Sequence, residues 1–220
     1  MSLNPNALTT VANAQAWLRR THATGTLATD DTAILTIIVN SVSTAIARYT
    51  RREFYDPSGN NSDMVRTFEY DGSGYLDFEP YDLRSITTIT LGGLALVATT
   101  GIGDGDYVAM PRNQTVDGTY LYLAARGYYH LGTSHFIFAP ITRTRDVVIT
   151  GKWGMTSVPP DVELACLIAT ADLYRNPEQV SSRGSGDFQM VEVSDNPGSE
   201  DSLPVGARRL LEPFIRPRVI

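Results

Sequence analysis

Apolar residues recur at intervals of three and four along the first 55 residues, which is the spacing of helices that bury one face. Thr9 or Thr10 can cap a short first helix. Asp30 and Asp31 suit the positive end of a longer second helix, which we expect over residues 31–51. Its apolar positions predict one buried face, made of Ile34, Ile37, Ile38, Val42, Ala45, Ile46 and Tyr49.

The hydrophobic spacing changes from near 3.6 to 2 after a turn-rich stretch at residues 56–64. Alternating and β-branched runs, separated by Gly and Asp turns, predict short strands. They are expected at residues 68–70, 75–78, 85–91, 94–98, 106–110, 119–124, 135–138 and 146–150. Many short strands of this kind are typical of a small antiparallel sandwich or barrel.

Helical spacing returns after Pro159 and Pro160, which favour a helix start, and ends at Asn176-Pro177. The apolar residues between them occupy several faces, so neighbours should bury this helix on more than one side. The predicted fold class is α+β. Its expected parts are a helical bundle from residues 1–55 and 155–180, an inserted antiparallel β-sandwich or barrel-like region at 56–154, a flexible linker at 181–203 and an extended C-terminal tail or helix at 204–220.

Composition narrows the class of protein. The chain has 220 residues, of which 42% are hydrophobic and 19% charged, and this excludes an intrinsically disordered chain. Its net charge of −6 argues against a free-standing DNA-binding protein, which normally carries a basic surplus. The single cysteine, Cys166, excludes a disulfide scaffold. We expect no signal peptide and no membrane span, because the longest apolar run is short, and we therefore expect assembly in a cytoplasm.

No residue pattern indicates an enzyme. His22, His130 and His135 lack the helical spacing of a zinc site, and Cys166 lies among apolar residues that do not activate a thiol. Gly103–Asp106 fits a β-turn better than a calcium loop. We find no phosphate loop and no nucleophile elbow. The sequence therefore predicts no catalytic residue, no metal and no cofactor.

The C-terminal tail combines apolar and basic residues. They are Arg208, Arg209, Leu210, Leu211, Phe214, Ile215, Arg216, Arg218, Val219 and Ile220. The residues leave two interpretations open: a helix packed on its own core, or a docking segment that orders only against a partner. On the second interpretation, truncation after Ser202 would leave a folded protein.

The layout resembles the head–tail connector or adaptor proteins of tailed phages, known as the gp6-like family, and the similar adaptors of gene transfer agents. Trp153-Gly154, then Val158-Pro159-Pro160-Asp161, then Leu173-Tyr174-Arg175-Asn176-Pro177-Glu178 match the end of the family's β-insertion and the helix after it. Ile46–Phe54, Leu83–Leu91 and Leu210–Arg218 are similar to its other stretches. The resemblance covers most of the chain.

This resemblance implies a structural virion protein without enzyme activity. It would form a ring, twelve-fold in the family, beneath the portal at the capsid vertex, assembled in the host bacterial cytoplasm. The implied partners are the portal protein, a stopper or tail-completion protein, and further copies of the chain, with double-stranded DNA passing through during ejection without specific binding. The tail would contact the portal or a neighbour. Helix packing between copies would involve Ile34, Ile38, Val42, Ile46, Tyr49, Leu164, Ile168 and Tyr174.

Three other classes stay open at this point. A stopper or tail terminator is the nearest competitor, but it would have a sheet-dominated fold without the long N-terminal helix. A β-sandwich binding module would explain the insertion but not the helices around it. An enzyme of unknown type would need a pocket with paired titratable groups.

Overall fold

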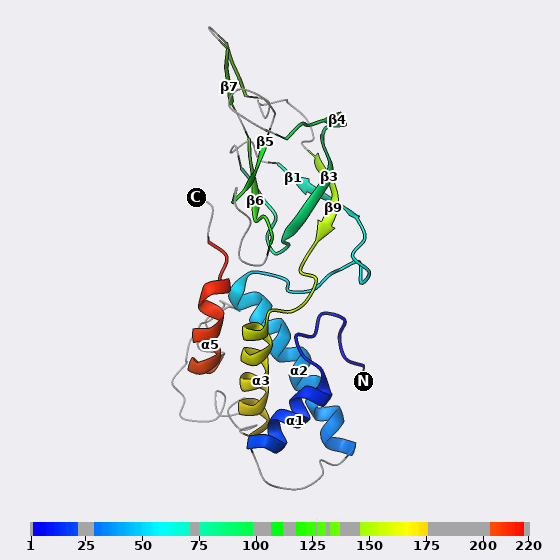
Figure 1. Ribbon diagram of the computed structural model, residues 1–220, viewed down its shortest axis with the longest axis vertical. Helices are drawn as coiled ribbons and strands as arrows, with labels where there is room; N and C mark the ends of the chain where they lie inside the picture. The colour runs from blue at the N-terminus through cyan, green and yellow to red at the C-terminus, as the bar shows by residue number, and fades with distance from the viewer. Residues whose placement is uncertain are drawn as a thin grey trace, which may run out of the picture. The chain divides into compact units, whose positions relative to one another are not determined.

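A computed structural model of the chain describes residues 2–21, 29–70, 75–98, 107–111, 118–125, 127–130, 133–136, 146–175 and 203–217. The chain divides into two compact units (Figure 1). The helical unit comprises Met1–Phe54 and Val158–Ile215, and the β unit comprises Tyr55–Ser157 and Arg216–Ile220. The predicted linker lies outside the described residues except for Leu203.

The helical unit is built around α3 (Pro160–Arg175), which contacts each of the other α-helices that the structure describes there. These are α1 (Val11–Thr21), α2 (Thr29–Thr50) and α5 (Val205–Leu211), and a short 3-10 turn, η2 (Glu212–Phe214), follows α5. The start of the unit is tied to α3 by Glu163, whose carboxylate accepts hydrogen bonds from Thr9 and Asn13. Bounds of α2 and α3 follow the hydrophobic repeat closely.

The buried face of α2 differs from the expected one. Leu35, Val39, Val42 and Ile46 are at most 2% exposed, whereas Ile34 and Ile37 are 49% and 47% exposed. The rest of the buried face is made of three hydroxyl residues: Thr36, Ser43 and Thr50. Each of them donates a hydrogen bond to a backbone carbonyl four residues earlier. A hydroxyl paired in this way can be buried at little cost. The expectation that Ile34 and Ile37 are buried within this chain was therefore wrong.

The β unit contains two main antiparallel sheets. The first has the order β1-β9-β3-β4, and the second has the order β2-β6-β5. The strands are β1 (Met64–Glu69), β2 (Tyr75–Asp77), β3 (Leu83–Leu91), β4 (Leu94–Ala95), β5 (Tyr107–Met110), β6 (Tyr122–Ala125) and β9 (Asp146–Trp153). A bridge between Leu83 and Tyr120 joins the two sheets. The fold is thus mixed α+β, and the described strands do not close into a barrel.

A separate hairpin is formed by β7 (Gly127–His130) and β8 (Thr133–Phe136). The sequence predicted a strand only for residues 135–138 in this region. Gly127-Tyr128-Tyr129-His130 shows no alternation of apolar and polar residues, so the first strand of the hairpin has no periodic signal.

Trp153 is the centre of the aromatic core in the β unit. Its ring lies 5.6 Å from the rings of Phe68 and Phe78, and its indole nitrogen donates to the Met64 carbonyl at 3.0 Å. Gly151 and Gly154 lie close to this tryptophan in the sequence. A Cβ at Gly151 would overlap the Ser85 carbonyl, so β3 and β9 can approach this closely only with glycine there.

Candidate assembly surfaces

The described residues contain no cluster of side chains that could hold a metal ion. No group of three His, Cys, Asp or Glu side chains comes together within them. Cys166 is fully buried, and burial raises the pKa of its thiol to about 11, which outweighs hydrogen bonding with Ser43 and Thr170. A thiol held neutral in this way is not a nucleophile at physiological pH. His22 and Gly103–Asp106 lie outside the described residues, as do the side chains of His130 and His135.

The solvent-facing side of α2 carries no charge over most of its length. From Thr32 to Ala47 the helix has no charged residue. The exposed members of this stretch are Thr32, Ala33, Ile34, Ile37, Ser41 and Thr44, which we call the α2 outer face. A helix face that meets only water normally carries charged and polar residues. An uncharged face with two exposed isoleucines is the type of surface that protein partners cover.

By length and composition alone, α2 would also be able to span a membrane, over Asp31–Thr50. The core helix of a soluble protein passes the same test. Since Leu35, Val39, Val42 and Ile46 are buried among the other helices, the apolar character of α2 is partly explained by its own core.

The residues predicted to pack helices between copies fall into two groups. Val42 and Ile46 are buried within this chain and offer no surface to a neighbour. Ile34 is exposed, and the remaining five are partly exposed: Ile38, Tyr49, Leu164, Ile168 and Tyr174. Tyr174 is close to Asp31, and burial together with that carboxylate raises the pKa of its hydroxyl. Of the predicted set, the residues that still offer surface are therefore divided evenly between α2 and α3, and Ile34 is the most exposed of them.

The described part of the tail packs on its own core. Leu203, Ala207 and Leu211 are at most 5% exposed, α5 contacts α3, and the ring of Phe214 meets Phe54 edge-on at 6.0 Å. Of the other predicted tail residues, Arg208 and Leu210 are partly buried, and Arg209 and Ile215 are exposed. Arg218, Val219 and Ile220 lie outside the described residues. The interpretation as a helix packed on its own core therefore holds for Leu211 and Phe214.

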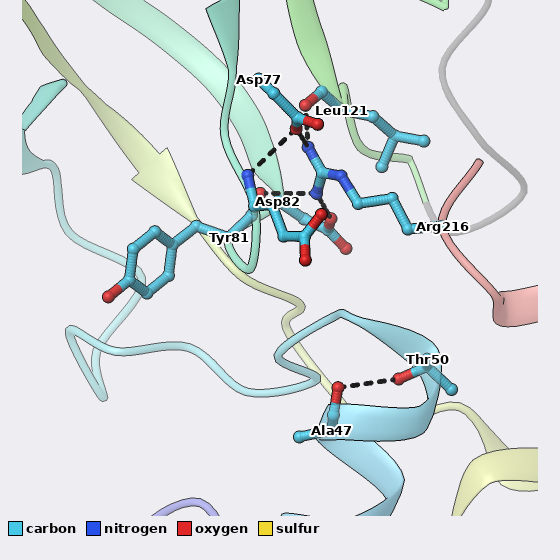
Figure 2. A network of polar contacts seen from close by, with 8 residues as sticks. Ala47, Thr50, Asp77, Tyr81, Asp82, Leu121 and Arg216 are labelled. Carbon is cyan, nitrogen blue, oxygen red and sulfur yellow. Dashed lines mark hydrogen bonds and ion pairs between the residues drawn. The ribbon is translucent and has the colours of Figure 1, made fainter. Parts of the chain in front are cut away.

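Arg216 has a different environment from the one expected for a docking residue. Its side chain is 1% exposed and lies within the β unit, where it pairs with Asp77 and Asp82 (Figure 2). A guanidinium enclosed in this way is not available to a partner. The sequence showed a basic residue among apolar ones and carried no signal of where its partners lie.

A second exposed apolar surface lies at the turn between β3 and β4. Gly92 and Gly93 adopt positive φ angles of 54° and 86°, as a two-residue hairpin turn requires. Leu94 and Val97 beyond the turn are 70% and 64% exposed. The sequence pattern predicted the strands but not this surface. The available signal was the absence of any charged residue from Ser85 to Gly103.

Two solved structures contain a chain with a similar fold. One is the neck of an empty gene transfer agent (GTA) particle with C6 symmetry, with a TM-score of 0.52 and 18% identity over 100% of this chain and 95% of that chain. The other is the virion of a native GTA particle, with a TM-score of 0.51 and 17% identity over the same shares. No protein-family model and no curated protein matches the chain. The likeness shows a shared fold over the full length, and membership of the gp6-like family stays a prediction.

Proposed function

We propose that this protein is a structural neck component of a phage-like particle, and within the neck a head–tail connector. Copies would form a ring beneath the portal, join capsid to tail and let DNA pass. The observation that carries the proposal is the full-length likeness in fold to a chain of a GTA neck. It agrees with the independent resemblance of the Ile46–Phe54 and Asp146–Glu178 segments to connector proteins.

The α2 outer face supports assembly into a ring. A ring needs one surface of each copy to pack against another surface of the next copy. Ile34 and Ile37 are exposed apolar side chains on a face without charge, so covering them with a neighbour releases water from apolar surface. A six-fold symmetric neck is compatible with six copies or with twelve. The proposed partners are therefore further copies of this chain, with the portal and a stopper or tail-completion protein at the two rims.

The net charge of −6 supports a role as a conduit. Binding to DNA depends on neutralising phosphates with Lys and Arg, and an acidic ring does not provide this neutralisation. DNA would then move through the ring without being held. In this role the protein needs no cofactor, metal or catalytic group.

Substitution on the α2 outer face tests the ring. Ile34→Glu and Ile37→Glu should leave the isolated protein folded, because both side chains are about half exposed. Incorporation into purified particles should fall at least about tenfold, since a buried unpaired carboxylate at each contact costs several kcal/mol. Val65→Glu is the matched control, because Val65 is an exposed apolar residue of the β unit. Normal incorporation of both isoleucine variants would contradict this interface.

Cryo-electron microscopy of the particle neck tests the position in the ring stack. A connector should contact the portal directly. If the chain instead lies below another ring, between that ring and the tail, the protein is a stopper or tail terminator. If it is absent from the neck, the proposed function fails.

A further inference from the structure

The chain passes from the helical unit into the β unit between Ile215 and Arg216. Arg216 is one of the largest fully buried side chains of the protein. Burial of a guanidinium carries a large cost in solvation, and this cost is offset only when its donors are paired with good geometry. The surroundings of Arg216 in the β unit therefore have to supply several acceptors.

Four acceptors surround the guanidinium (Figure 2). One terminal nitrogen donates to the Tyr81 carbonyl at 3.0 Å and to the Asp82 carboxylate at 3.2 Å. The other donates to the Asp77 carboxylate at 2.5 Å and to the Leu121 carbonyl. Asp82 is fully buried, whereas the side chain of Asp77 is 35% exposed at the rim. Two carboxylates and two carbonyls thus accept hydrogen bonds from the two terminal nitrogens, and the carboxylates more than balance the single positive charge of the guanidinium.

The acceptors are held in place by contacts that do not involve Arg216. The Asp77 carboxylate oxygen that faces Arg216 also accepts the Glu79 backbone N–H at 3.0 Å. The Asp82 carbonyl accepts the N–H of Gly154 at 2.7 Å, which fixes the backbone beside its carboxylate. Groups fixed in advance lose little freedom when they bind a ligand.

We infer that Asp77, Tyr81, Asp82 and Leu121 form a guanidinium-binding socket on the β unit. Arg216 fills it and thereby holds the backbone of Arg216 and Pro217, the C-terminal segment, against that unit. The socket is selective for the planar fork of an arginine, because a lysine ammonium cannot reach acceptors arranged around a plane.

Chemical rescue of Arg216→Ala tests the socket. This variant leaves Asp82 buried without its cation, so its Tm should fall by roughly 10 °C. Millimolar methylguanidinium should restore part of that loss, and methylammonium, which has the same charge, should not. Arg209→Ala removes an exposed arginine from the same tail and should change neither Tm nor the response to methylguanidinium. An unchanged Tm in Arg216→Ala, or equal rescue by both cations, would overturn the inference.

A double-mutant cycle keeps the test valid if Arg216→Ala does not fold. Asp77→Asn alters the exposed rim of the socket and should lower Tm by a few degrees in the native chain. Combined with Arg216→Lys, the same change should cost much less, because the two side chains act through one contact. Additive losses would count against the socket.

The hold on the C-terminal segment can be measured separately with a spin label at Pro217→Cys, since Pro217 is exposed and Cys166 is buried. We expect the label to become more mobile when Asp77→Asn or Arg216→Lys is added, and to stay unchanged with Arg209→Ala. Equal mobility in all of these variants would show that Arg216 does not hold the segment.

Discussion

At the scale of single residues, Gly154 has no room for a side chain. Its φ angle is +68°, and a Cβ at this position would overlap the Tyr55 carbonyl. We expect Gly154→Ala to lower the free energy of unfolding by about 2–4 kcal/mol, through backbone strain and a displaced carbonyl. Gly206→Ala on α5 is the matched control, because its Cβ would meet open space and alanine favours the helix. Urea unfolding measures both, and equal losses would contradict this account.

The buried thiol of Cys166 predicts a dependence of stability on alkaline pH. In the unfolded chain the thiol loses its proton near its ordinary pKa of 9.0, whereas in the folded protein burial raises the pKa to about 11. Between these values the unfolded chain binds fewer protons, so the free energy of unfolding falls as pH rises. Below pH 9 this contribution is fully present. Urea unfolding from pH 8 to 10.5 should show a steeper loss for the native chain than for Cys166→Ala, and parallel curves would refute the prediction.

At the scale of elements, the C-terminal helix α5 belongs to the helical core. Truncation after Ser202 removes the buried side chains of Leu203 and Leu211, and it empties the Arg216 socket. We expect a loss of Tm of about 10 °C or more, in contrast to the tolerance that a free docking segment would show. Differential scanning calorimetry measures this loss.

A single substitution tests whether the loss of Tm comes from the buried side chains of α5 and not from the number of residues deleted. Leu211→Ala should cost about 2–5 kcal/mol, because it leaves a cavity next to α3. Leu210, its partly exposed neighbour, provides the control, and Leu210→Ala should cost less than half as much. If truncation and Leu211→Ala both leave Tm unchanged, α5 does not contribute to the core.

At the scale of the whole molecule, the net charge of −6 predicts weak interaction with nucleic acid. Random duplex DNA should not bind with submicromolar affinity at physiological salt, because few phosphates would be neutralised. Fluorescence anisotropy with a labelled duplex, repeated at low and high salt, measures this binding. Tight binding that weakens steeply with salt would exclude the role of a conduit that lets DNA slide.

The amino-acid sequence by itself determined the kind and the order of the long elements, although it gave no signal for the short strand β7. Helix α2 was expected at residues 31–51 and spans Thr29–Thr50, and α3 was expected after Pro159-Pro160 and begins at Pro160. These features follow from local causes, which are the hydrophobic repeat, acidic residues at the helix start and prolines at the ends. The turn glycines at 92 and 93 were predictable for the same reason.

The tertiary structure alone decided which face of α2 is buried and where Arg216 lies. Both sides of α2 carry isoleucine, leucine or valine, and hydroxyl groups that bond to their own helix let Ser43 and Thr50 enter the core, so periodicity did not distinguish the two sides. Arg216 pairs with Asp82, 134 residues earlier in the chain, and with a carbonyl 95 residues earlier. Partners so distant along the chain become neighbours only after the strands that carry them have paired. The free energy of their contact depends on the resulting geometry, which the local sequence pattern does not contain.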